Sequence, residues 1–210
     1  MSRHVVLEFD DTADAFGTRR RRLAFWINAY NTLVARGIRR LALRESVWEV
    51  PDFFSVIRCR LGDLVLNADE IEHGVLRANR PSPLAVTPPF APGDPRLMLT
   101  VEPMDARIHF AINCGARSCP PARRYDADEL ERQLDDATRF YLERELTVEN
   151  HVLYACELFR WFRGDFEASA GGLQGFLLHH LPPGAVRRAV HEHGVARMEY
   201  RPYDWRLSDG

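Results

Sequence analysis

Lysine is missing from this chain, and all 28 of its basic residues are arginine. No residue can therefore act as a Schiff-base lysine, as the phosphate-binding lysine of a Walker motif or as the base of a Ser–Lys dyad. Because 30 acidic residues leave a formal net charge of −2, the composition indicates no general attraction to nucleic acid or to an acidic membrane. These absences remove several large classes of enzyme and of binding protein.

Cysteine and long apolar runs are also scarce. The four cysteines, at positions 59, 114, 119 and 156, are too few and too scattered for a disulfide scaffold, and they lack the Cys-x-x-Cys spacing of a structural zinc site. No apolar run approaches the roughly 20 residues of a membrane span, and residues 1–14 are polar and acidic where a signal peptide needs an apolar segment. We therefore expect a soluble, cytoplasmic protein with no membrane partner.

The length and the periodicity predict a single globular domain over residues 1–210, of the α+β class, in which several helices pack on a small, mostly antiparallel sheet. Apolar residues recur with helical spacing over 19–36, and Gly37 is placed to cap the end of that helix. Further helices are predicted over 67–78, from 126 onward, and over 152–166 and 172–181, with a closing strand over 196–203. Six prolines between residues 80 and 95 predict a long irregular loop that borders a cleft.

The segment from His109 to Pro121 concentrates the residues that can carry chemistry. It reads His-Phe-Ala-Ile-Asn-Cys-Gly-Ala-Arg-Ser-Cys-Pro-Pro. Apolar and other positions alternate from 108 to 113, which predicts a buried central strand that carries His109 and runs into a loop. The glycine and the two prolines turn the chain around both cysteines.

A thiol-dependent enzyme needs a cysteine held as thiolate by an imidazole, with a third group fixing the ring. Cys119 and Cys114 are the candidate nucleophiles, and His109 or His73 is the candidate base. In an extended strand Cys114 would lie roughly 16 Å beyond His109, too far for a contact, whereas the turn at Gly115 can return Cys119 toward the ring. We therefore prefer Cys119 as the nucleophile and His109 as the general base.

Other polar residues are expected to support this pair. Within its predicted helix, Glu72 lies beside the apolar stripe and His73 lies on the opposite face. A carboxylate at the margin of a core needs a partner, so Glu72 is expected to orient the imidazole or to stabilise its charge. His73 replaces His109 as the base if that helix turns its polar face into the cleft. Asn113, or the backbone N–H groups at Gly115, would be the oxyanion donors.

The helix over 19–36 contributes two amides to the same region. Asn28 and Asn31 lie three positions apart on an otherwise apolar segment. Buried amides need hydrogen-bond partners. We expect them to bind backbone groups of the 109–121 loop, with an incoming substrate as the alternative partner.

Two other functions stay open at this point. His73, His109 and one cysteine could bind zinc, which would make the protein a zinc-dependent hydrolase that uses the same residues. Alternatively, the domain is a non-enzymatic module that binds another protein through an exposed apolar surface around Phe53–Phe54 or Phe159–Phe162.

Six blocks together extend over nearly the whole chain: Ala24–Asn31, Ala68–His73, His109–Pro121, Phe159–Phe162, Asp165–Phe166 and Tyr203–Trp205. These blocks resemble the signature blocks of the domain of unknown function 547 family. The resemblance implies a single domain, with a family core over about residues 20–207, found in bacterial proteins and at the C-terminal end of longer plant proteins. It also implies that plant members carry serine at the position of Cys119 and keep the cysteine that matches Cys114. At the level of residue types, a remote likeness to papain-like or transglutaminase-like cysteine enzymes follows.

Together these patterns predict a cysteine-dependent hydrolase or acyl-transferase. Its expected substrate is a small peptide or another molecule with an amide bond, and no cofactor is expected. A protein partner is expected only if the domain is the binding module, and no nucleic-acid partner is expected.

Overall fold

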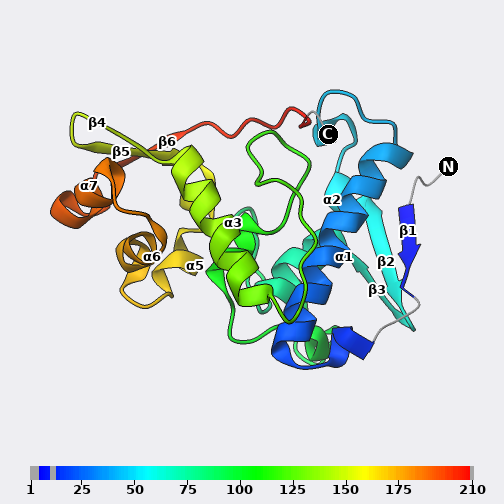
Figure 1. Cartoon of the computed structure of the whole chain (residues 1–210). Coiled ribbons are helices and arrows are strands. Elements are labelled where there is room, and N and C mark those ends of the chain that lie inside the picture. Colours follow the sequence, from blue (N-terminus) through cyan, green and yellow to red (C-terminus); the bar gives the residue numbers. More distant parts are fainter. Residues whose placement is uncertain (1–4, 10–12, 209–210) are drawn as a thin grey trace. The chain divides into compact units, whose positions relative to one another are not determined.

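The computed structural model describes residues 5–9 and 13–208, and the contacts within it divide the chain into two units (Figure 1). Unit 1 consists of Met1–Leu130 together with Trp205–Gly210, and unit 2 consists of Glu131–Asp204. The prediction of one domain over 1–210 stays a prediction, and each unit is described by itself.

Unit 1 is built on a three-stranded sheet in the order β1-β2-β3. Strand β1 (Val5–Glu8) pairs in parallel with β2 (Ile57–Leu61), and β2 forms an antiparallel hairpin with β3 (Leu64–Asn67). The parallel pair needs a long crossover, which contains the 22-residue helix α1 (Arg19–Arg40). Alternate residues of β1 and β2 are buried, and α1 runs alongside this sheet in Figure 1.

The sequence predicted Gly37 as the C-cap of this helix, but Gly37 lies inside α1. A Cβ at this position would lie 2.7 Å from Cγ2 of Ile57 and 3.1 Å from the ring of Phe53. The glycine therefore lets the helix approach the sheet closely, and the helix continues for another turn to its cap at Leu41. Packing decided the role of this glycine.

The remaining elements of unit 1 are short. One is an α-helix, α2 (Phe53–Val56), and one is a π-helix, η3 (Glu70–Leu76). The loop over residues 80–94 has no helix or strand, as its prolines predict. Four 3-10 helices complete the unit: η1 (Ala13–Phe16), η2 (Val47–Glu49), η4 (Pro95–Leu99) and η5 (Ala106–Phe110).

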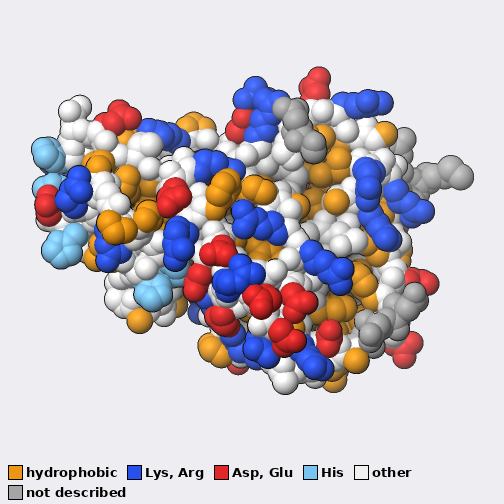
Figure 2. Space-filling model, in the orientation of Figure 1, with side chains coloured by type: hydrophobic (Ala, Val, Ile, Leu, Met, Phe, Trp, Pro, Cys, Tyr) orange, Lys and Arg blue, Asp and Glu red, His pale blue; other side chains and the backbone are white. Residues whose placement is uncertain are grey.

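Unit 2 has a second three-stranded sheet, in the order β4-β5-β6. Strand β4 (Thr147–Glu149) pairs antiparallel with β5 (Val152–Cys156), and β5 pairs in parallel with β6 (Met198–Arg201). Figure 2 shows histidine side chains gathered over the part of this unit that holds α7. The helices of the unit are α3 (Leu130–Glu145), α4 (Leu158–Trp161), α5 (Arg163–Glu167), α6 (Gly172–His180) and α7 (Ala185–His193).

The two sheets with their helices confirm the predicted α+β class. Two details differ from the expectation. Each sheet is small and mixed, because each joins one hairpin to one parallel strand that returns after intervening helices. The helix predicted over 152–166 begins instead with strand β5, because a tight turn with positive φ at Asn150 and His151 folds this apolar run back onto β4. Short apolar runs do not distinguish a strand from a helix.

Among the described residues, no helix combines the length and the apolar character that a membrane crossing requires.

Candidate functional site

Two asparagines on α1 hold backbone segments that come from much later in the chain. Asn31 donates from Nδ2 to the carbonyl oxygen of Ala111 at 3.0 Å, and its Oδ1 accepts from the N–H of Asn113 at 2.7 Å. Asn28 makes the same pair of bonds with one residue: it donates to the carbonyl of Tyr125 at 2.7 Å and accepts from its N–H at 2.9 Å. Both amides bind backbone groups, but only Asn31 binds the 109–121 loop as expected, and it fixes the cysteine loop to α1, whereas Asn28 binds Tyr125 beyond that loop.

The loop from Asn113 to Pro120 is closed by its own hydrogen bonds. Asn113 donates from Nδ2 to the carbonyl of Pro120 at 2.7 Å, and its Oδ1 accepts from the N–H of Gly115 at 2.7 Å. Gly115 has φ +90°, and a Cβ there would lie 2.5 Å from Cδ1 of Ile38, so both its conformation and its surroundings require glycine. The C-terminal segment lies along the other side, where the N–H of Ser208 donates to the carbonyl of Gly115 at 3.0 Å.

This closure corrects the predicted oxyanion donors. The oxygen and one N–H of the Asn113 amide are used inside the loop, and so is the backbone N–H of Gly115. Groups bound in this way are not aimed at a reacting carbonyl.

The two cysteines of the loop lie against each other. The Sγ atoms of Cys114 and Cys119 are 2.7 Å apart, and the backbone N–H of Cys114 donates to Sγ of Cys119 at 3.0 Å. Cys119 is 5% exposed, whereas Cys114 is partly exposed. An N–H that donates to a sulfur stabilises its thiolate form, so the geometry favours the negative charge on Cys119.

The helix predicted over 67–78 begins with a capping box, in which two residues bond each other's backbone N–H groups. Asn67 accepts from the N–H of Glu70 at 2.8 Å, and Glu70 accepts from the N–H of Asn67 at 2.9 Å. The helix that follows, η3, is a π-helix, in which the N–H of Arg77 donates to the carbonyl of Glu72 five residues earlier. π-Helical turns are rare and occur frequently at functional sites.

The wider winding corrects the predicted position of His73. An α-helical wheel placed His73 and Arg77 on an exposed face, but they are only 7% and 5% exposed. Because each turn of a π-helix takes up more residues than an α-turn, the angular positions read from a 3.6-residue period do not apply. Arg77 donates from its guanidinium to Nδ1 of His73, at 3.0 Å.

That contact determines how the His73 ring can act. A guanidinium only donates hydrogen bonds, so Nδ1 of His73 accepts, and a neutral ring then carries its proton on Nε2. Glu72 lies beside the ring, with Oε1 3.9 Å from Nδ1, beyond hydrogen-bond distance. In its neutral form the His73 ring can therefore donate from Nε2.

Buried acidic groups lie near the His73 ring. The hydroxyl of Tyr30, on α1, donates to Oε2 of Glu72 at 3.0 Å. Burial, with the charges of Glu72, Cys114 and Cys119, holds the pKa of Tyr30 well above its ordinary value, so the phenol stays protonated. The charges of Glu72 on η3 and of the two loop cysteines therefore all act on the Tyr30 hydroxyl. The close approach of Glu72 to the cysteine loop stays a prediction.

Asp69 belongs to the same cluster. Burial raises the pKa of its carboxyl, the charge on His73 opposes that rise, and the charge on Glu72 adds to it. The hydroxyl of Ser55 donates to Oδ2 of Asp69 at 3.1 Å. A buried carboxyl with a raised pKa beside a histidine is a common feature of functional sites.

His109 does not lie on a central strand, contrary to the prediction. It lies in the 3-10 helix η5, which Asp105 caps by accepting from the N–H of Arg107 at 3.1 Å. Burial alone would raise the pKa of Asp105, but its bonds with Arg107 hold that pKa below the ordinary value. Ile108, His109 and Phe110 are all buried, so the alternation of residue types along this segment does not correspond to one buried and one exposed face of a strand.

This correction removes the distance argument against Cys114. A 3-10 helix rises only about 2.0 Å per residue, and the two sulfurs lie 2.7 Å from each other. Distance from His109 therefore does not separate them, and the choice depends on their own hydrogen bonds and exposure. The role of His109 as the base stays a prediction.

The sequence analysis missed Tyr30, Asp69 and Arg77 as members of the site. Tyr30 is a buried residue of an otherwise apolar helix and Asp69 lies at the start of η3, so neither belongs to a polar pattern that points to a site. The spacing of Arg77 four residues after His73 was an available signal for their contact. Within the described residues, no three His, Cys, Asp or Glu side chains are grouped to hold a metal ion, so no observation favours the zinc alternative.

A family model described as "Protein of unknown function, DUF547" matches residues 15–142, more than half of the chain. The chain belongs to the DUF547 family. All of the site residues described above lie within the matched segment, and the resemblance predicted for later blocks, from 143 to 207, stays a prediction. No curated protein and no solved structure matches the chain, so the remote likeness to papain-like or transglutaminase-like enzymes also stays a prediction.

Proposed function

We propose that this DUF547 protein is a cysteine-dependent hydrolase or acyl-transferase that acts on a peptide or amide bond. The observation that carries the proposal is the hydrogen bond from the backbone N–H of Cys114 to Sγ of Cys119, 3.0 Å long. The thiolate is the nucleophilic form of cysteine, and this donor stabilises it. The charge of Cys119 acts on Tyr30 of α1, together with the charges of Cys114 and of Glu72 on η3.

The proposed reaction starts with transfer of the Cys119 proton to His109, the general base. The thiolate adds to the carbonyl carbon of the substrate, and the resulting oxyanion collapses as the amine leaves with the proton from His109. Water or an acceptor amine then releases the acyl group from Cys119. Neutral His73, which can donate from Nε2, is the proposed oxyanion donor in place of Asn113 and Gly115.

Glu72 is proposed to orient the imidazole or to stabilise its charge. It accepts from Tyr30, which stays protonated, and lies 3.9 Å from the His73 ring. In this arrangement its negative charge lies beside the His73 ring without a hydrogen bond to Nδ1, which accepts from Arg77. We propose a reducing, cytoplasmic setting, in which the reduced form of the two loop thiols predominates.

Labelling of the native protein with iodoacetamide tests the nucleophile. Trypsin cleaves after Arg117, between the two cysteines, so labels on Cys114 and Cys119 appear in different peptides. We expect labelling at Cys119 at neutral pH, loss of that label in Cys119→Ser, and an unchanged pattern in the control variant Cys156→Ala. Labelling of Cys114 alone would move the nucleophile to that residue.

Reaction with an activated ester tests the chemistry. We expect a burst of leaving group and an acyl adduct on Cys119, both lost in Cys119→Ser. His109→Asn should slow acylation about 100-fold or more, the usual contribution of a general base, while His73→Asn should leave the pH profile in place. Stoichiometric zinc in the purified protein would overturn the covalent mechanism.

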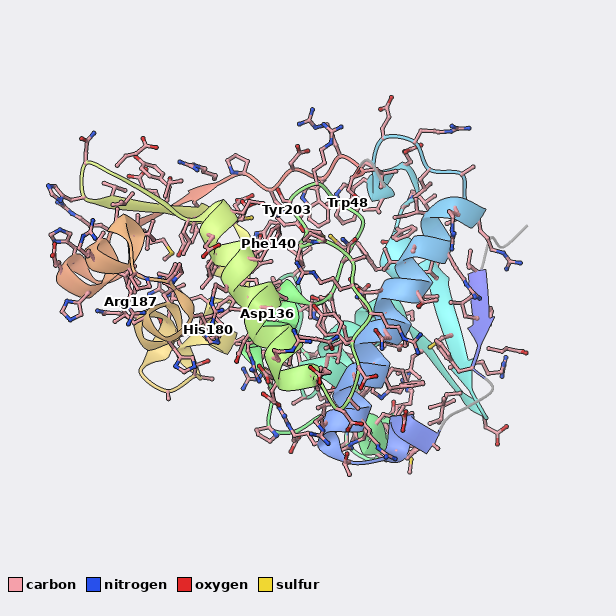
Figure 3. All side chains as sticks on the ribbon, viewed as in Figure 1. Trp48, Asp136, Phe140, His180, Arg187 and Tyr203 are labelled. Carbon is pink, nitrogen blue, oxygen red and sulfur yellow. The ribbon has the colours of Figure 1, made fainter. Side chains whose placement is uncertain are left out.

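A protein-binding module is the second candidate, and the exposed apolar side chains favour it. Phe53 and Phe159, at the centres of the predicted surfaces, are fully buried, which corrects that expectation. Instead Leu84 is 97% exposed and Val86 95% exposed, in the proline-rich loop. Trp48, which is labelled in Figure 3, is 49% exposed and makes an edge contact with Trp205, so it is a second exposed apolar group on unit 1. If iodoacetamide labels no cysteine of the native protein, this candidate replaces the enzyme.

A further inference from the structure

We propose that Cys114 and Cys119 form a reversible disulfide, and that the loop is a site of thiol–disulfide exchange with small-molecule disulfides. The inference does not depend on the proposed hydrolase activity. The Sγ atoms are 2.7 Å apart in the reduced protein. A disulfide bond is about 2.05 Å long, so the sulfurs need to approach by only about 0.7 Å.

The reduced loop already has the closed form that the disulfide requires. The amide of Asn113 joins both ends of the loop, through its bonds to Gly115 and Pro120. The N–H of Cys119 donates to the carbonyl of Ala116 at 3.0 Å, which adds a tight turn between the cysteines. Ordering of the chain, which normally opposes ring closure, has therefore taken place before the bond forms.

The hydrogen bond between the cysteines favours the reaction chemically as well. The reacting species in exchange is the thiolate. The N–H of Cys114 stabilises a thiolate on Cys119, and the second sulfur lies within contact of it. Cys114 is partly exposed, so a small disulfide can reach the pair.

The other two cysteines are poorly suited to exchange. Burial raises the pKa of Cys59 to about 12, and burial also raises the pKa of Cys156. Their side chains are 0% and 2% exposed. Oxidation should therefore select the loop pair among the four cysteines of the chain.

The reaction balances with a small-molecule disulfide as the oxidant. One loop thiolate attacks a sulfur of that disulfide, its S–S bond breaks, and one small thiolate leaves. The second loop thiolate attacks the protein sulfur of the mixed disulfide, the new intramolecular bond forms, and the second small thiolate leaves. The two protons of the loop thiols end on the two small thiols, so the protein loses two electrons and the oxidant gains them.

Mass spectrometry of the tryptic digest tests the proposal directly. The reduced protein is equilibrated with mixtures of glutathione and glutathione disulfide, quenched with acid, alkylated and digested. Because Arg117 separates the cysteines, the disulfide joins two peptides, residues 108–117 and 118–123. We expect this joined pair to accumulate with glutathione disulfide and to disappear with excess glutathione, while Cys59 and Cys156 remain alkylated.

Matched variants and an unfolded control complete the test. Cys114→Ser and Cys119→Ser should give only a mixed disulfide with glutathione, and Cys156→Ala should form the joined pair as the wild type does. In concentrated urea the ratio of joined pair to mixed disulfide should fall at least about tenfold, because the folded loop supplies the effective concentration. Mixed disulfides without the joined pair in the folded wild type would overturn the proposal, and so would an equal ratio in urea.

The outcome is separable from that of the proposed hydrolase. A joined pair in a protein that never forms an acyl adduct leaves this inference standing and removes the enzyme. An acyl adduct on Cys119 without a joined pair does the reverse. If both form, oxidation should abolish acylation and glutathione should restore it.

Discussion

Replacing Asn31 by alanine tests how the cysteine loop is held. The amide binds the carbonyl of Ala111 and the N–H of Asn113, at 3.0 and 2.7 Å. Alanine removes both partners and leaves the two backbone groups unpaired. We expect the variant to fold with a lower free energy of unfolding and with a loosened loop.

The magnitude follows from the burial of the two backbone groups. An unsatisfied buried group costs about 1–3 kcal/mol. Ala111 is 0% exposed, so its carbonyl carries most of such a cost, whereas Asn113 is half-buried and water can replace part of its lost bond. The expected loss is therefore about 2–4 kcal/mol, which is a large fraction of the roughly 5–15 kcal/mol that stabilises a typical protein.

Urea unfolding measures this loss, and Asn28→Ala is the matched control. Asn28 also binds two backbone groups, both on Tyr125, which is buried. Both variants should lose similar stability with unchanged m-values. Only Asn31→Ala should change the rate at which iodoacetamide labels the loop thiols, because only Asn31 holds the residue next to Cys114.

Two results would refute the reasoning. A loss below about 0.5 kcal/mol in Asn31→Ala, the ordinary range for a surface substitution, would mean that the two bonds do not hold the loop. An equal change in thiol labelling in Asn28→Ala would mean that the effect spreads through general destabilisation and not through the loop.

Three further predictions concern the surroundings of the site. In Gly74→Ala the new Cβ would lie 2.4 Å from the ring of Phe90, so thermal unfolding should show a loss of about 1–3 kcal/mol from overpacking; an unchanged melting temperature would contradict this. Burial raises the pKa of the Asp69 carboxyl in the folded protein above its ordinary value. Below that ordinary pKa the carboxyl is neutral in both the folded and the unfolded chain, so its full contribution to stability is present there. This contribution is lost as the pH rises through the folded-state pKa. Asp69→Asn should therefore melt higher than the wild type at pH 7, and the gap should close in acid; a gap independent of pH would show that the charge is not the cause. Tyr30→Phe leaves Glu72 without its hydroxyl donor, 3.0 Å away, and should cost about 1–3 kcal/mol in urea unfolding, a loss that Glu72→Gln should reduce if the charge of the carboxylate is responsible.

Local patterns in the sequence were sufficient for several elements. Helix α1 follows from its apolar periodicity, and the capping box of Asn67 and Glu70 forms as the spacing predicts. The proline-rich segment has no helix or strand because proline removes the backbone donor that either ladder needs. These features depend on neighbours within one or two turns of chain, which is the range that a sequence pattern records.

The conformation of the two histidine segments was not predictable in that way. His109 lies in a 3-10 helix because Asp105 caps it and because packing buries all of its sides. His73 points into the protein because η3 is a π-helix, and the periodicity of the sequence does not predict a π-helix. In both cases the residue pattern is present in the sequence, but tertiary contacts gave the segment a conformation other than the one that the pattern predicts.

The sequence by itself supplied the candidate residues for chemistry in this DUF547 protein, which are two thiols, two histidines and a carboxylate in a chain without lysine. Only the tertiary structure decided how they meet. It brought the sulfurs of Cys114 and Cys119 to 2.7 Å, joined Tyr30 to Glu72 across 42 positions of sequence, and committed the amide of Asn113 to the loop. The physical reason is that hydrogen bonds and burial act between groups that are neighbours in space, and spacing along the chain does not specify those neighbours once a loop lies between them.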